Sequence, residues 1–294
     1  MGAGGASAMT AIAPIVSADE LGAYPHAVLA DVRWYLDGRS AREAYEAGHL
    51  PGAIFVDLET QLAGHGQPAS AGRHPFPTPD AFADAMGALG IGDDTTVIAY
   101  DDTGGMTAGR LVVMLRMIGR NAAVLDGGID AWHGPLTTGA GTASEHRHFT
   151  VREWPTERFA TADETAALAQ SQTGVVMDAR SRERYTGEVT LVDPRPGHVP
   201  GAVSAPFAAA IDPATKRFRL PTELREHFAA LGVSDGGGGG GGNGVVTYCG
   251  SGVSACVNIV AMEHAGLPPA RLYVASFSGW AADLERDVEL GPGR

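Results

Sequence analysis

The chain has few cysteines, no long apolar run and fewer basic than acidic residues. Two cysteines, Cys249 and Cys256, among 294 residues are too few for a disulfide framework, which favours a reducing compartment and makes the cytoplasm the expected location. No stretch of eighteen apolar residues occurs, so we expect no membrane span. Lysine and arginine number 21 against 34 acidic residues, and the resulting net charge of -13 disfavours nucleic acid and anionic membrane surfaces as partners.

Metal-binding patterns are absent as well. The ten histidines are scattered, and none has the spacing to a cysteine or a second histidine that would define a zinc site. We therefore predict that no metal and no cofactor takes part. The remaining composition, 44% apolar and 19% charged over 294 residues, is typical of a soluble globular protein with about two domains.

The chain contains one series of motifs twice. The offset is 147 residues between Asp31 and Asp178 and 148 between Asp101 and Cys249, which suits a duplicated domain and is too long for a solenoid. The first copy reads Asp31-Val32-Arg33, Gly48-His49-Leu50-Pro51-Gly52-Ala53, Tyr100-Asp101 and Gly128-Ile129-Asp130-Ala131-Trp132, and the second reads Asp178-Ala179-Arg180, Gly197-His198-Val199-Pro200-Gly201-Ala202, Tyr248-Cys249 and Phe277-Ser278-Gly279-Trp280.

Short Val/Ile/Leu-rich runs in each copy alternate with segments of helical period, such as Pro79–Leu89 and Pro221–Leu231. This alternation predicts an α/β fold with parallel strands and crossover helices in each half. Ligands of such sheets bind beyond the carboxyl ends of the strands. The residues of most interest therefore directly follow strands: Asp31, Asp101, Asp178 and Cys249.

We place a first domain at residues 10–135, a polar linker at 136–160 and a second domain at 161–290. The glycine run Gly236–Gly242 resembles a phosphate-binding loop only superficially, because it precedes a strand and no helix follows it directly. We predict a surface insertion there.

The segment around Cys249 predicts an anion-binding loop. A strand over residues 244–248 runs into a loop with two glycines, Gly250 and Gly252, and an apolar helical stretch begins at Cys256. Backbone amides of such a loop, with the positive end of the following helix, stabilise a thiolate or a terminal sulfur anion. The alternative is that Cys249 is a small buried hydrophobe, and for Cys256, inside the helical stretch, packing is the favoured role.

The order of motifs in both halves resembles the tandem-domain rhodanese family, over about residues 10 to 290. The loop Cys249-Gly250-Ser251-Gly252-Val253-Ser254-Ala255 resembles the active loop of the family's mercaptopyruvate sulfurtransferase branch. The resemblance implies two rhodanese-like domains, each a mostly parallel sheet flanked by helices. It also implies transfer of a sulfane sulfur from 3-mercaptopyruvate or thiosulfate to a thiol or cyanide acceptor. Because Gly250 and Ser251 stand where thiosulfate-type members carry basic residues, 3-mercaptopyruvate is the favoured donor.

The same resemblance assigns roles to individual residues. Cys249 becomes the nucleophile and persulfide carrier, and the amides of Gly250, Ser251, Gly252, Val253 and Ser254 hold the charge. Ser251 is expected to form a hydrogen-bonded set with Asp57 and His74 of the first half. Arg184 is expected to bind the donor's carboxylate, and Arg195 is expected to be a second donor-binding arginine. The alternatives are a loop histidine without a role at His74 and solvated arginines at Arg184 and Arg195.

Two further expectations concern the first copy and the competing functions. Asp101 occupies the cysteine position, and since a carboxylate cannot hold a sulfane sulfur, this copy should be catalytically silent. A persulfide relay to a protein partner is a second hypothesis. A cysteine phosphatase or arsenate reductase is a third, disfavoured because the phosphate-clamping arginine six positions after the cysteine is replaced by Ala255.

Overall fold

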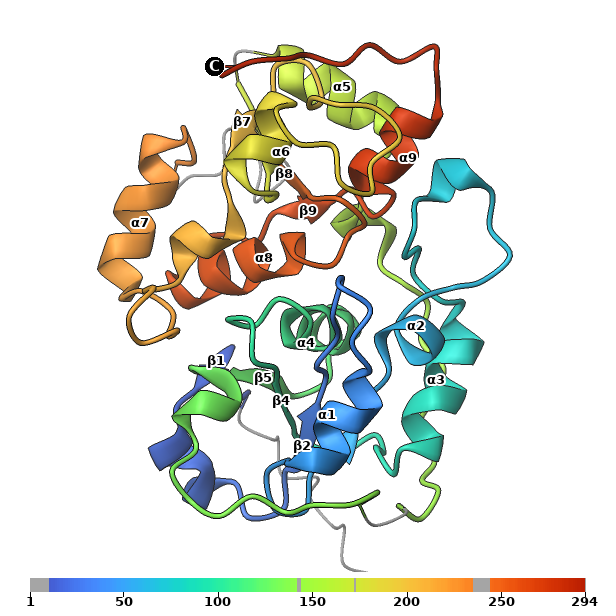
Figure 1. The fold of residues 1–294 in the computed structure, drawn as a ribbon, viewed down its shortest axis with the longest axis vertical. Coiled ribbons are helices and arrows are strands. Elements are labelled where there is room, and N and C mark those ends of the chain that lie inside the picture. The colour runs from blue at the N-terminus through green and yellow to red at the C-terminus, as the bar shows by residue number, and fades with distance from the viewer. Residues whose placement is uncertain (1–10, 142–143, 172, 235–243, 294) are drawn as a thin grey trace, which may run out of the picture.

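The computed structural model describes residues 11–141, 144–171, 173–234 and 244–293. The predicted insertion Gly236–Gly242 lies outside the described residues. The described chain forms two parallel sheets, one in each half, with strand orders β1-β5-β4-β2-β3 and β7-β6-β8-β9. The predicted α/β architecture with two similar units is therefore confirmed, and Figure 1 shows the two units one above the other.

The first unit builds its sheet from strands on both sides of β4. The strands are β1 (Ile15–Val16), β2 (Val28–Asp31), β3 (Ile54–Phe55), β4 (Val97–Tyr100) and β5 (Ala122–Leu125), and the helices are α1 (Ala41–Ala47), α2 (Leu58–Gln61), α3 (Pro79–Ala88) and α4 (Ala108–Met117). All residues of β4 and β5 are buried, as expected for strands covered on both faces. Helix α3 begins with Pro79 after the side chain of Thr78, which accepts a hydrogen bond from the Ala81 amide.

The second unit repeats this arrangement around β8. Its strands are β6 (Val175–Asp178), β7 (Val203–Ser204), β8 (Val245–Tyr248) and β9 (Arg271–Leu272), and its helices are α5 (Ala162–Gln170), α6 (Arg182–Thr186), α7 (Pro221–Ala230), α8 (Ala255–His264) and α9 (Ser276–Ala282). Short 3₁₀ helices span Ala18–Ala23, Ala69–Ala71, Gly128–Ala131, Thr156–Arg158 and Phe207–Ala210. No helix in the described part of the chain is both long and apolar enough to cross a bilayer.

The internal repeat extends to individual hydrogen bonds. In the first copy Arg33 pairs with Asp31, at 2.7 Å, and its other bond from Nη2 goes to the carbonyl of Gly48. In the second copy Arg180 pairs with Asp178 and donates in the same way to the carbonyl of Gly197. Asp31 and Asp178 are completely buried in these pairs, so they fasten the strand ends to the following motif and do not face a ligand crevice.

The segment between the two units packs along the first one. Phe149 contacts Phe82 edge-on, with ring centroids 6.0 Å apart, and the Trp154 indole donates a 2.9 Å hydrogen bond to the carbonyl of Pro77. The residues predicted as a polar linker therefore include aromatic anchors that hold this segment against the first unit.

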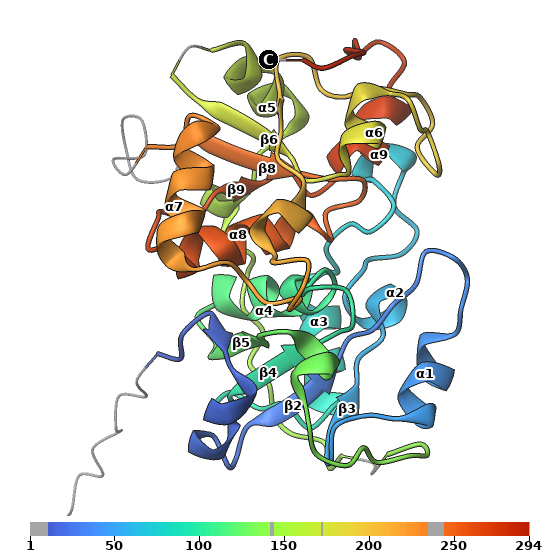
Figure 2. The same cartoon turned by 60° about the vertical axis from the view of Figure 1, so that its left-hand side comes forward.

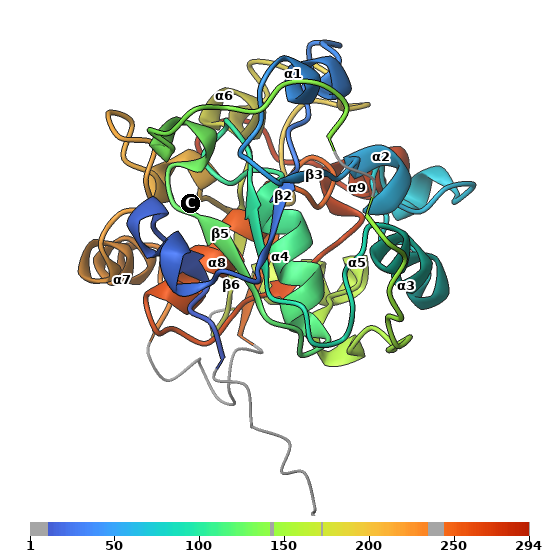
Figure 3. The ribbon, with the colours of Figure 1, turned by 90° about the horizontal axis from the view of Figure 1, so that it is seen from below.

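Helices α4 and α8 form the centre of the contact between the units. They occupy equivalent places in the two copies, each following a central strand, and they pack directly against each other. Gly109 allows the close approach, because a Cβ there would lie 3.5 Å from the Val257 amide nitrogen. Figures 2 and 3 show α4 next to α8 near the middle of the molecule. The loops that precede these helices consequently lie at the boundary between the two units.

Candidate active site

Cys249 directly follows β8, at the carboxyl edge of the second sheet. Its side chain is only 1% exposed, and its Sγ accepts a 3.1 Å hydrogen bond from the amide of Gly252. Its own amide donates to the Ser276 hydroxyl at 3.1 Å, and its carbonyl accepts from the Phe277 amide at 2.9 Å. Ser276 adopts a left-handed conformation, φ 53°, which is strained for a residue with a side chain. The backbone of the cysteine is thus fixed on both sides.

The loop after Cys249 curls back toward the sulfur. Gly252 has φ +78°, and a Cβ there would lie 2.5 Å from the carbonyl oxygen of Val274, so only glycine fits. This conformation aims the Gly252 amide at the thiol. Val253 and Ser254 line the cavity in front of the sulfur, and α8 begins at Ala255. The predicted strand, loop and helix around the cysteine are confirmed.

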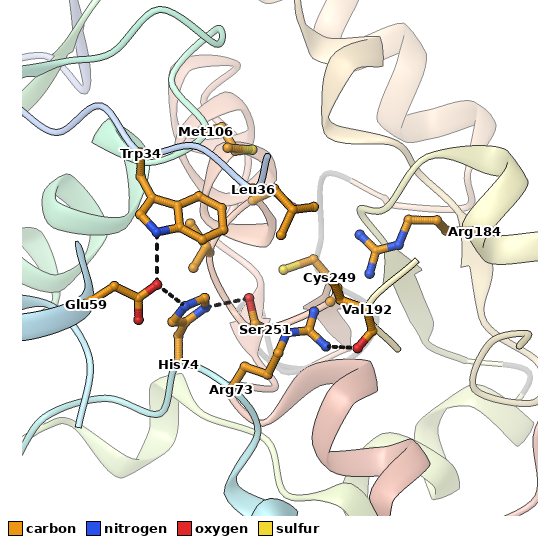
Figure 4. A pocket seen from close by; sticks show the side chains of 13 residues that line it. Trp34, Leu36, Glu59, Arg73, His74, Met106, Arg184, Val192, Cys249 and Ser251 are labelled. Atoms are coloured by element: carbon orange, nitrogen blue, oxygen red, sulfur yellow. Dashed lines mark hydrogen bonds and ion pairs between the residues drawn. The ribbon is translucent and has the colours of Figure 1, made fainter. Parts of the chain in front are cut away.

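The thiol opens into a cavity of about 450 Å³ between the two units. The lining residues come from both halves: Trp34, Leu36, Glu59, Arg73, His74 and Met106 from the first, and Arg184, Val192, Cys249, Gly250, Ser251, Val253 and Ser254 from the second. Figure 4 shows Cys249 between the aromatic and aliphatic side chains on one side and two arginines on the other. A cavity of this size admits a small organic anion together with part of a second reactant.

A chain of hydrogen bonds reaches the loop from the first unit (Figure 4). Nδ1 of His74 lies 2.8 Å from the Ser251 hydroxyl, and Nε2 lies 3.1 Å from Oε1 of Glu59. The same carboxylate oxygen accepts a 2.9 Å bond from the Trp34 indole. Burial lowers the pKa of His74, and Glu59 only partly opposes this, so the ring is neutral near pH 7. A neutral ring that donates from Nε2 to Glu59 accepts the Ser251 proton at Nδ1.

Glu59, and not Asp57, is the carboxylate that contacts His74. The Asp57 side chain accepts hydrogen bonds from the amides of Glu59 and Thr60, at 2.8 and 3.2 Å, and caps the N-terminus of α2. The expectation that Asp57 completes the set with Ser251 and His74 is therefore wrong. The Asp57 carboxylate accepts hydrogen bonds from the first amides of α2, and Glu59, on the same helix, contacts His74.

Two arginines from different units flank Gly250. Arg184 of α6 hydrogen-bonds through Nε to Asp193 at 3.1 Å, and Arg73 of the first unit reaches the other oxygen of Asp193, also at 3.1 Å. Both guanidinium groups line the cavity. A Cβ at Gly250 would lie 2.7 Å from Nη2 of Arg184 and 2.9 Å from Nη2 of Arg73. The missing side chain at Gly250 thus brings two cations to the edge of the cysteine loop, where they can hold an anionic ligand.

The structure places Arg195 elsewhere. Its guanidinium donates to the backbone carbonyls of Ala281, Asp283 and Arg286, at 3.1, 2.8 and 2.9 Å, and it does not line the cavity. The structure therefore does not bring Arg195 to the cavity with Arg184. The Arg195 side chain ties the end of α9 to the segment before Gly197. Arg73, which the sequence did not single out, stands beside Arg184 in its place.

The equivalent loop in the first unit is filled by its own carboxylate. Oδ1 of Asp101 accepts from the amides of Thr103 and Gly105, both at 2.9 Å, and Oδ2 accepts from those of Thr107 and Ala108, at 2.9 and 3.0 Å. Asp101 is fully buried. The amides that would surround a sulfur anion in an active copy are therefore saturated by a built-in anion.

Within the described residues no group of three or more histidine, cysteine or carboxylate side chains could hold a metal ion. Cys256 is completely buried, and its Sγ donates to the carbonyl of Gly252 at 3.4 Å. Burial raises the pKa of Cys256 to about 12, so this thiol stays protonated and is not a nucleophile.

Comparisons with known proteins agree with this architecture. The model of the rhodanese-like domain matches residues 17–135 and 161–283. A probable 3-mercaptopyruvate sulfurtransferase of Pseudomonas aeruginosa is 35% identical over 291 residues, which cover 95% of this chain and 99% of that protein. A putative thiosulfate sulfurtransferase of Mycobacterium tuberculosis, SseB, is 36% identical over 270 residues, which cover 89% of this chain and 90% of the relative.

Solved structures resemble the chain over both units. SseA from Escherichia coli, described as having the rhodanese fold, superposes with a TM-score of 0.77 at 28% identity and covers 90% of this chain and 99% of its own. Tum1 from Saccharomyces cerevisiae superposes with a TM-score of 0.80 over 96% of this chain and 99% of its own. At 22% identity, the second likeness concerns the fold alone.

Proposed function

The chain belongs to the rhodanese family, and we propose that it is a sulfurtransferase that moves a sulfane sulfur from 3-mercaptopyruvate or thiosulfate to a thiol or cyanide acceptor. The observation that supports this most is the placement of Cys249. Its Sγ accepts a 3.1 Å hydrogen bond from the Gly252 amide, and the residue lines a cavity that also contains two arginines. In this proposal residues 161–290 form the catalytic domain, and residues 10–135 form a silent one because Asp101 fills its anion site.

The first half-reaction loads the cysteine. The Cys249 thiolate attacks the donor's terminal sulfur, and a new S–S bond forms while the bond from that sulfur to the rest of the donor breaks. With 3-mercaptopyruvate the electron pair of the broken C–S bond goes to carbon, and the enolate of pyruvate leaves. With thiosulfate the pair of the broken S–S bond leaves with sulfite. The Gly252 amide, already directed at Sγ, stabilises the sulfur anion at the end of the loop.

Arg184 and Arg73 orient the donor. Both pair with Asp193, which also pairs with the buried Arg180. Arg180 has Asp178 as a second partner, so the carboxylates leave positive charge at the cavity wall for a ligand. The planar fork of an arginine suits the carboxylate of 3-mercaptopyruvate. Because Gly250 and Ser251 place no cation inside the loop next to the sulfur, we favour this donor over the dianion thiosulfate.

The serine, histidine and glutamate handle the proton that the leaving group needs. Ser251 lies in the cavity wall and is bonded to His74, which Glu59 orients. When Cys249 ionises, His74 takes up the thiol proton at Nδ1 by way of the Ser251 hydroxyl and becomes an imidazolium ion opposite Glu59. An enolate that then forms near Ser251 takes the hydroxyl proton, and Nδ1 replaces it, so the ring is neutral again. Thiosulfate needs no such proton transfer, because sulfite leaves without it. The set is therefore expected to matter more for 3-mercaptopyruvate.

The second half-reaction regenerates the thiolate. An acceptor thiolate or cyanide attacks the outer sulfur of the persulfide, the S–S bond to Cys249 breaks, and its electron pair returns to Sγ. Several apolar side chains near the cavity are exposed: Leu36 is 51%, Leu191 67% and Val192 42% exposed. These side chains favour, as a second candidate role, delivery of the sulfur to a protein thiol. We also place this chemistry in a reducing compartment such as the cytoplasm, where Cys249 stays unpaired.

Steady-state sulfur transfer to cyanide tests the proposal, with 3-mercaptopyruvate and thiosulfate compared as donors for the wild type and Cys249→Ser. We expect kcat/KM to favour 3-mercaptopyruvate, parallel lines in reciprocal plots and no turnover in the variant. Intersecting lines, or turnover that survives the substitution, would contradict the persulfide mechanism. A preference for thiosulfate would leave the nucleophile in place and overturn the argument from the uncharged loop.

A further inference from the structure

Arg110, on α4 of the catalytically silent domain, is completely buried beneath the cysteine loop of the other domain. Its Nη1 donates a 2.9 Å hydrogen bond to the carbonyl of Gly252, the residue whose amide is directed at Cys249 Sγ. Its Nη2 donates to the carbonyls of Leu62 and His74, at 3.0 and 2.9 Å. One guanidinium group thus joins the cysteine loop to the segment that carries the histidine of the site.

The charge of Arg110 has no carboxylate partner among the described residues. Arg33 and Arg180, which are also buried, pair with Asp31 and Asp178, whereas Arg110 contacts only carbonyls and the face of the Phe76 ring, whose centroid lies 4.0 Å away. A buried cation without a counter-charge is costly. Burial accordingly lowers the pKa of Arg110 to about 10, a value at which it is still charged at neutral pH.

Two thiols lie near enough to interact electrostatically with this charge, Cys249 and Cys256. Cys256 cannot supply the negative charge, because it is protonated and donates to the same Gly252 carbonyl. Cys249 can do so, both as the thiolate and as the persulfide of the proposed reaction. The counter-charge that Arg110 lacks therefore forms when Cys249 ionises.

We propose that Arg110 is a positioning residue for the nucleophile: it holds Gly252 so that its amide faces Sγ, and it supplies the positive charge that balances ionised Cys249. This inference rests on the proposed function and deepens it. It also gives the silent domain a part in catalysis, since α4 follows the inactive loop of Asp101 and delivers a cation to the active loop of its partner domain.

Other ionisable groups face Cys249 and must be separated from Arg110. Arg73 and the His74–Glu59 pair approach from the first domain, and Arg184 from α6. All of these line the cavity, where solvent and the donor reach them, whereas Arg110 lies behind the loop and is fully buried. A comparison of Arg110 variants with the wild type, made without donor, leaves these cavity groups unchanged and reports the effect of Arg110 on Cys249.

The test measures the rate at which iodoacetamide alkylates Cys249, as a function of pH, in the full chain without donor. The variants are Arg110→Gln and Arg110→Lys, and Arg116→Gln is the matched control, because Arg116 is on the same helix and contacts Glu263 of the other domain at 3.0 Å, away from the loop. Removal of a nearby cation should move the midpoint of the profile upward by about one pH unit or more in Arg110→Gln. The midpoint of Arg116→Gln should equal that of the wild type.

Arg110→Lys keeps the charge but loses the fork, so its midpoint should shift less than that of Arg110→Gln while its kcat for sulfur transfer falls by about tenfold. This variant also keeps the test open if Arg110→Gln does not fold. An unchanged midpoint in Arg110→Gln, or a lysine variant with both the midpoint and the kcat of the wild type, would overturn the inference. Failure of the wild type to use any sulfur donor would instead count against the proposed function, because alkylation does not depend on it.

Discussion

The anion built into the silent domain makes Asp101→Asn an informative substitution. The Asp101 carboxylate accepts hydrogen bonds of 2.9 to 3.0 Å from four backbone amides, those of Thr103, Gly105, Thr107 and Ala108. An amide side chain has one oxygen for two of these donors and turns its NH2 group toward the other two. Two buried amides left without acceptors, at about 1–3 kcal/mol each, predict a loss of about 2–6 kcal/mol in the free energy of unfolding.

Urea unfolding followed by circular dichroism measures this loss in the unfolding transition of the first domain, which contains Asp101. Asp57→Asn is the control, because Asp57 also accepts two backbone amides but does so as a helix cap, where asparagine and aspartate are equally effective. Asp101 does not line the cavity, so the folded variant should keep its kcat. A loss below about 1 kcal/mol would refute the idea that the inactive loop is an anion site held closed by its own carboxylate.

Three further predictions concern the cavity. Glu59→Gln should lower kcat with 3-mercaptopyruvate by about tenfold or more, since it loosens His74, whereas steady-state rates of Asp57→Asn should be normal. Arg184→Gln should raise KM for the anionic donor about tenfold or more, and Arg195→Gln should instead lower the melting temperature at unchanged KM. Because burial lowers the pKa of His74, activity that needs the neutral ring should persist below pH 6.5. The contribution of His74 to the free energy of unfolding should be complete above pH 6.5 and decline as the pH falls through its lowered pKa. A kcat/KM profile that already declines at pH 7 through this group would contradict both expectations.

The sequence predicts the fold and the nucleophile because both follow from local patterns. Period and order of apolar runs define the parallel strands, and the repeat of Asp31-Val-Arg33 as Asp178-Ala-Arg180 aligns the two copies. The glycines around Cys249 indicate the loop, since a left-handed Gly252 is what a chain needs to turn its amides toward a preceding side chain.

The partners of the nucleophile depend on contacts between distant segments, and sequence patterns predict these poorly. Asp57 and Glu59 are two positions apart, and only the geometry of α2 decides which one faces His74. Arg195 is an arginine in a suitable stretch, yet its Nε and Nη2 donate to backbone carbonyls at the end of α9. The position of Arg110 could have been recognised from the sequence. A single arginine directly before the apolar run Leu111–Leu115 predicts a buried charge with a specific partner.

The most direct test of the account is the mass of the protein after incubation with 3-mercaptopyruvate alone, followed by removal of the donor and peptide mapping without reductant. We predict the addition of one sulfur atom on the peptide that contains Cys249, its loss when cyanide or a thiol is added, and no addition in Cys249→Ser. An unmodified Cys249 peptide, or the extra sulfur on Cys256 instead, would contradict the claim that Cys249 carries the transferred sulfur.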